Sequence, residues 1–175
     1  MSLEAVGHSI DVGLAADVAS CTRTAGQLAD LAGAFDRAAT VLERHATVDE
    51  AAFGGLSGIV YRHSSTLLRH GCERTGRRSR RLAEGLTAYA QGMAEVRRRL
   101  DEAVTVAAPH LRVTDDRIWS PTLPPDPDDA GLGQAWAAWR DAVDRWRAAR
   151  DLEERTSQAW LVALDRGVTI DGALP

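Results

Sequence analysis

The residues best suited to catalysis or metal binding in this sequence do not have the spacing that either task requires. His63 and His70 are seven residues apart, which is about 10 Å along a helix, whereas helical metal ligands stand three or four residues apart. Ser57 follows Gly55 at the spacing of a nucleophile elbow, but Ile59 occupies the second glycine position. The sequence contains no motif typical of a phosphate-binding loop, a four-ligand zinc site or a pair of catalytic carboxylates. We therefore expect a protein that is not an enzyme and that uses no metal or cofactor.

A cluster of arginines offers a binding chemistry instead. Five of them fall within eight positions: Arg74, Arg77, Arg78, Arg80 and Arg81. Guanidinium groups bind carboxylates and phosphates, but helical spacing spreads these five around the helix. The favoured interpretation is a solvated stretch paired with nearby acids, and the alternatives are an acidic protein partner and a nucleic acid. The net charge of −4 argues against a duplex DNA binder.

Four tryptophans within residues 132–166 form the other notable group. Trp136, Trp139 and Trp146 recur at helical spacing, and Trp160 lies beside Leu161 further along. An aromatic stripe on a helix most often fills a core, so packing within the protein is the favoured interpretation. A partner surface is the alternative, which makes these residues the candidate interface.

The apolar residues recur with a heptad spacing, a rhythm that predicts long helices as the elements that carry these arginines and tryptophans. Steps of alternately four and three residues from Leu14 to Ala46 meet only apolar side chains, which predicts one helix from Asp11, as its N-cap, to about His45. The same rhythm recurs from Leu82 to Ala107. It predicts a second helix over about residues 57–108, ended by Pro109.

The remaining sequence predicts a connector and a third helix. Residues 109–131 contain prolines among acidic residues and are expected to be extended, with partly polyproline character. Residues 132–166 repeat a helical spacing, and residues 167–175 read as a tail. The predicted fold class is therefore all-α: a long antiparallel helical hairpin over residues 1–108, followed by the connector and the third helix. Two cysteines, Cys21 and Cys72, are too few for a disulfide framework and are predicted to be buried free thiols.

Two long helices joined by a bend that contains Phe53, Gly54 and Gly55 resemble the Trp-x-Gly family of type VII (ESX) secretion substrates, with phenylalanine at the tryptophan position. The likeness covers residues 10–108. It implies hairpins that pair as four-helix homo- or heterodimers and are exported folded, or a helical N-terminal region that targets an actinobacterial polymorphic toxin to the same system. The family's export signal, an aromatic residue followed four positions later by Asp or Glu, is absent. Either export then depends on a partner's signal, or the protein is not exported.

The leading hypothesis is a type VII secretion-associated helical protein that acts through coiled-coil pairing. Its partner would be a small helical hairpin protein or a second copy, with a toxin or its chaperone as a further partner. One alternative is a cytoplasmic adaptor or chaperone that docks a partner through the third helix, and another is a nucleic-acid-associated regulator that uses the arginine segment. The sequence contains neither an apolar run of about 20 residues nor a signal peptide. We thus expect a cytoplasmic location before any export, and export without a cleavable signal.

Overall fold

The computed structural model describes residues 7–47 and 53–168. The protein is 77% helical, with three helices and one small sheet in the described residues, which confirms the predicted all-α class. The helices are α1 (Val18–Ala46), α2 (Gly55–Ala107) and α3 (Ala130–Val168), and the strands are β1 (Ser9–Asp11), β2 (Val113–Thr114) and β3 (Arg117–Trp119). Most of the predicted tail lies outside the described residues.

The chain divides into two compact units. The sheet unit comprises residues 1–18 and 90–158, and the hairpin unit comprises residues 19–89 and 159–175. These units cut across the ranges predicted from the sequence, because α2 and α3 each contribute residues to both units.

The sheet unit contains an antiparallel sheet in the order β1-β3-β2. Ile10 of β1 pairs with Ile118 of β3, and the two side chains are only 2% and 0% exposed. The core also includes Met93, Val96 and Leu100 of α2, all almost completely buried. Burial of this apolar face explains why so small a sheet persists.

The start of the first helix was predicted wrongly. Asp11 is not its N-cap but the last residue of β1, and α1 begins seven residues later at Val18. The carboxylate of Asp11 accepts a hydrogen bond from the backbone N–H of Gly13 at 2.8 Å, and Val12 donates its N–H to the carbonyl of Asp116 at 2.7 Å. The first contact is a local turn closed by the side chain of Asp11, and the second ties Val12 to the turn between β2 and β3. Asp17, directly before the helix, is a residue type favoured at the N-cap.

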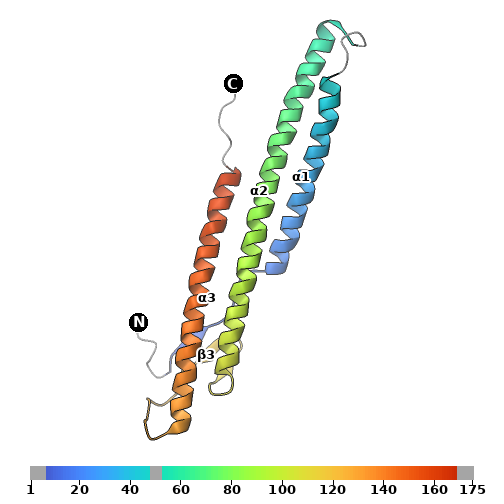
Figure 1. Ribbon diagram of the computed structural model, residues 1–175. Helices are drawn as coiled ribbons and strands as arrows, with labels where there is room; N and C mark the ends of the chain where they lie inside the picture. Colours follow the sequence, from blue (N-terminus) through green and yellow to red (C-terminus); the bar gives the residue numbers. More distant parts are fainter. Residues whose placement is uncertain (1–6, 48–52, 169–175) are drawn as a thin grey trace. The chain divides into compact units, whose positions relative to one another are not determined.

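In the hairpin unit, α1 and α2 run side by side in opposite directions (Figure 1). Asp36 of α1 forms an ion pair with Arg80 of α2. Nine residues further along α1, His45 Nδ1 shares a hydrogen bond of 2.8 Å with the hydroxyl of Tyr61. Contact positions fall along α2 as they rise along α1, so the helices are antiparallel. The predicted hairpin is confirmed, with Phe53 and Gly54 directly before α2.

Candidate interaction surface

Small residues line the contact between α1 and α2. Ala25, Ala32 and Ala39 recur every seven residues along α1 and are its buried side chains. A Cβ added at Gly76 of α2 would lie 3.3 Å from the Cβ of Phe35 and 3.5 Å from the carbonyl oxygen of Ala32. The backbones therefore approach closely, and there is no room between them for large side chains.

The same face of α2 continues with small residues at intervals of seven. Ser65 and Ser79 are buried, and Cys72 between them is a half-buried free thiol. Cys21 of α1 is likewise free and half-buried. Both thiols are thus less buried than the sequence predicted, because each lies at the margin of a narrow helix contact.

Large apolar side chains near the bend point away from this contact. We call Leu56, Ile59, Val60 and Leu67 the apolar stripe. Their exposed fractions are 78%, 56%, 55% and 57%. At about 100° per residue, all four fall within one arc of α2 about 100° wide. A stripe of this kind normally faces another element of structure, and here no described residue covers it.

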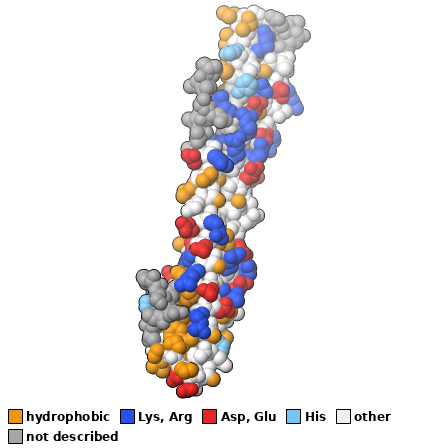
Figure 2. Space-filling model, turned by 60° about the vertical axis from the view of Figure 1, so that its left-hand side comes forward, with side chains coloured by type: hydrophobic (Ala, Val, Ile, Leu, Met, Phe, Trp, Pro, Cys, Tyr) orange, Lys and Arg blue, Asp and Glu red, His pale blue; other side chains and the backbone are white. Residues whose placement is uncertain are grey.

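Arginines follow the apolar stripe along the same face of α2. Arg74, Arg77, Arg78 and Arg81 recur three and four residues apart, and their angular positions fall within the same arc of about 100°. All four side chains are exposed, and we call them the arginine face. Figure 2 shows arginines gathered in a band, with histidines and apolar side chains nearer the end of the hairpin.

The prediction that the arginines are spread around α2 is therefore wrong for four of the five. Only Arg80 lies outside the shared arc, and its guanidinium forms the ion pair with Asp36 of α1. Across residues 7–47 and 53–168, none of the four arginines of the arginine face has a carboxylate within ion-pair distance. The favoured pairing with nearby acids thus applies to Arg80 and not to the arginine face.

His63 and His70 are exposed on the same side of α2. Nε2 of His70 lies 2.9 Å from the guanidinium of Arg69, which in turn pairs with Glu73 at 2.8 Å. Within the described residues, no group of three histidine, cysteine or acidic side chains is placed to hold a metal ion.

The C-terminal end of α3 covers the next part of this face of α2. A Cβ added at Gly85 would lie 2.9 Å from the Cβ of Ala163 and 3.3 Å from the indole ring of Trp160. The rings of Trp160 and Tyr89 have centroids 6.0 Å apart. Trp160 is thus a packing residue between α3 and α2, and α2 accepts a closely packed helix on this face.

The other three tryptophans of the candidate interface lie in the sheet unit. Trp136 and Trp139 are 2% and 1% exposed, so both are core side chains. The indole N–H of Trp136 donates to the carbonyl of Leu123 in the connector at 3.0 Å. Half-buried Trp146 donates its N–H to the carbonyl of Asp11 at 2.7 Å, and Arg150 donates to the same oxygen at 2.8 Å. These indoles join α3 to the connector and to β1.

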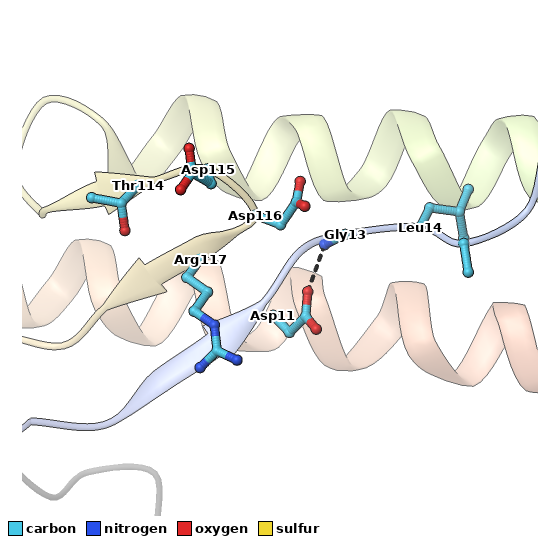
Figure 3. Close-up of a pocket in the computed structure, with 8 residues that line it drawn as sticks. Asp11, Gly13, Leu14, Thr114, Asp115, Asp116 and Arg117 are labelled. Carbon is cyan, nitrogen blue, oxygen red and sulfur yellow. Dashed lines mark hydrogen bonds between the residues drawn. The ribbon is translucent and has the colours of Figure 1, made fainter.

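An open pocket of about 500 Å³ lies beside the two-residue turn between β2 and β3 (Figure 3). Its polar lining consists of Asp11, Thr114, Asp115, Asp116 and Arg117. Asp115 has a φ of 47°, a left-handed conformation that tightens the turn. The lining residues do not include a histidine, cysteine or lysine that could act as a base or nucleophile beside the carboxylates.

Four charged residues of α2 in the sheet unit form an ion-paired network: Glu95, Arg98, Arg99 and Glu102. Glu95 accepts hydrogen bonds from Arg98 and Arg99, which lower the pKa of its carboxyl to about 2. Arg98 also pairs with Glu102. The hydrogen bond that Arg98 donates to Glu95, followed by the nearby charge of Glu102, raises the pKa of Arg98. This network neutralises the exposed side of α2 locally.

Comparisons of this chain with protein family models, curated proteins and solved structures give no match. None of the helices in the described residues is both long enough and apolar enough to span a membrane.

Proposed function

We propose that the protein is a non-enzymatic helical interaction protein that pairs its α1–α2 hairpin with another helical hairpin. The observation that carries this proposal is the distribution of side-chain size near the bend. The buried positions of the α1–α2 contact near the bend are alanine, glycine and serine, whereas the apolar stripe of α2 is exposed. Such an arrangement is typical of one half of a helical bundle, in which the large residues await a second pair of helices.

The apolar stripe can supply a useful part of the pairing energy. Complete burial of a Leu, Ile or Val side chain contributes about 1.5–3 kcal/mol. More than half of each stripe residue is exposed, so covering the four would contribute roughly 4–6 kcal/mol. Micromolar pairing requires about 8 kcal/mol net of the entropy of association. The stripe therefore needs a partner that also presents apolar residues.

We further propose that this pairing serves a type VII secretion system, either as a secreted subunit or as the targeting region of a toxin. The support is the resemblance carried by Phe53, Gly54 and Gly55 between two long helices. Phe53 stands two residues before the start of α2, is 43% exposed, and packs edge-on to Tyr61 with ring centroids 5.5 Å apart.

Light scattering after size-exclusion chromatography tests the pairing, with the protein alone and co-expressed with hairpin proteins encoded beside it. The variant L56S/L67S should lose the complex without a lower melting temperature, since both leucines are exposed. L123S is the matched control, because Leu123 is 61% exposed in the connector. A protein that stays monomeric at all concentrations and with every neighbouring hairpin would contradict the proposal.

Export provides a separate test of the type VII assignment. We expect the protein in the culture filtrate of its host only when the secretion ATPase is intact. The opposite result is that the protein stays in the cytoplasm both of the host with an intact secretion ATPase and of a host without it. If hairpin pairing is intact, this result would contradict only the type VII part of the proposal.

The adaptor alternative must rely on residues other than the buried Trp136 and Trp139. Leu161 and Val162 of α3 are 63% and 49% exposed, and they are the apolar side chains that a docked partner could cover. Loss of the complex in L161S but not in L56S/L67S would favour this second function.

A further inference from the structure

We propose that the helix that docks on α2 is acidic and amphipathic: its carboxylates bind the arginine face, and its apolar side chains cover the apolar stripe. This inference rests on the proposed function, and it specifies the chemistry of the partner. The partner helix would continue the line along which α3 already packs on α2.

The length of the surface that no described residue covers sets the length of the partner. The apolar stripe and the arginine face together extend from Leu56 to Arg81, which is about 38 Å along α2 at 1.5 Å per residue. A partner helix of about 25 residues would cover this distance. Its apolar half must face the apolar stripe and its acidic half must face the arginine face.

The direction of the partner follows from α3. A Cβ at Gly167 would lie 2.6 Å from Leu82, whereas Ala163 meets Gly85 and Trp160 meets Tyr89. At these contacts the residue numbers fall along α3 as they rise along α2, so the two helices are antiparallel here. A partner in the same orientation would carry its carboxylates in its N-terminal half, where negative charge also suits the helix dipole.

Electrostatics favours an anionic occupant for the arginine face. Arg74 and Arg78, like Arg77 and Arg81, are four residues apart, and like charges at this spacing destabilise a helix. No carboxylate of the described residues forms an ion pair with these four arginines, whereas Arg98 pairs with both Glu95 and Glu102. A helix with carboxylates three and four residues apart would relieve the repulsion and form up to four ion pairs.

The apolar stripe favours a protein helix over nucleic acid or lipid as the source of the negative charge. Leu67 lies one helical turn from His70 and two turns from Arg74 on the same face, and a phosphate backbone would leave the stripe uncovered. Gly85 shows in addition that this face permits the close approach of a helix backbone. The net charge of −4 opposes general attraction to nucleic acid or anionic membranes.

Synthetic peptides provide a direct test with the full-length protein. The first peptide is a 25-residue amphipathic helix, about the length of the free surface, with a leucine seam throughout and four glutamates in its N-terminal half. The second peptide replaces these glutamates with glutamine, and the third replaces them with lysine. Fluorescence anisotropy should show the glutamate peptide binding about tenfold more tightly than the glutamine peptide at low salt. This difference should shrink at high salt.

Charge reversal identifies the residues involved. R74E/R78E should weaken binding of the glutamate peptide and strengthen binding of the lysine peptide. R97E/R140E is the matched control, because both of these arginines are exposed in the sheet unit, and it should change neither. Circular dichroism must show equal helicity and melting for the variants.

Each remaining outcome separates the inference from the proposed function. Equal affinities for the glutamate and glutamine peptides, both lost in L56S/L67S, would overturn the acidic partner and leave hairpin pairing in place. Failure of every peptide to bind would also overturn the inference, while light scattering would still decide the pairing. Binding of a 20-base-pair duplex or of anionic vesicles that disappears in R74E/R78E, without a peptide effect, would assign the arginine face to phosphates instead.

Discussion

Replacement of glycine by alanine at two positions of α2 should change stability in opposite directions. Gly71 has no heavy atom within 4 Å of the place where a Cβ would stand. G71A should therefore stabilise the protein by about 1 kcal/mol through helix propensity alone. At Gly92 the added Cβ would lie 2.5 Å from Cγ2 and 2.8 Å from Oγ1 of Thr156.

Thr156 is short and β-branched, so α3 must shift or the threonine must leave its rotamer. Overpacking of this kind costs about 1–3 kcal/mol, which exceeds or cancels the gain in propensity of about 1 kcal/mol. G92A should thus be destabilising by up to about 2 kcal/mol. For a chain of this size the expected change in Tm is about 2–4 °C per kcal/mol.

Urea and thermal unfolding followed by circular dichroism measure both variants. In a T156A background the atoms at 2.5 and 2.8 Å are gone and the Cβ of residue 156 is 3.2 Å away. G92A should then become neutral or stabilising. If G92A in the native background stabilises as much as G71A, the close packing of α2 and α3 at this position is incorrect.

Three further measurements test other parts of the structure. Trp139→Ala should destabilise by about 3–5 kcal/mol because the indole is buried, and Trp160→Ala should cost less because its indole is half exposed, as urea unfolding would show. NMR should place the pKa of Glu95 near 2 rather than 4.5. Because the folded pKa is lowered, its ion pairs stabilise above about pH 4.5 and are lost as pH falls toward 2, and Glu95→Gln should flatten this dependence. Asp115→Gly should be neutral or stabilising by up to about 1–2 kcal/mol, since glycine adopts a φ of 47° without strain, whereas Asp115→Val should destabilise in the same unfolding assay.

The heptad rhythm predicted the helices well where tertiary contacts follow it. The second helix was expected over residues 57–108 and α2 is Gly55–Ala107, while α3 extends two residues beyond each predicted end. The heptad spacing gave a wrong prediction at Leu14. This residue is in phase with the apolar residues of α1 but lies before the helix begins. An apolar residue at the right spacing does not show whether the backbone is helical, and here the pairing of β1 with β3 determined the conformation instead.

The small sheet could not be read from the sequence, because its strands have two or three residues each. Alternation of apolar and polar residues needs four or more positions to be recognised. Ile118 and Trp119 follow the turn at Asp115 and Asp116, and this aspartate pair was the available signal. The arginine face, in contrast, was open to prediction, because angular positions computed for Arg74 to Arg81 show the shared side directly.

The contrast between the two parts of α2 explains why a partner is expected at one of them. In the sheet unit, Met93, Val96 and Leu100 are at most 1% exposed, and this unit also buries the large apolar side chains of Trp136, Trp139 and Ile118. Near the bend, α1 is the described element that packs on α2, and its buried side chains are alanines. Two helices in contact bury only narrow strips of their surfaces, so the large residues on the outer side of α2 gain nothing from the hairpin itself. We therefore propose a further helix as the element that buries these residues and neutralises the arginine face that follows them.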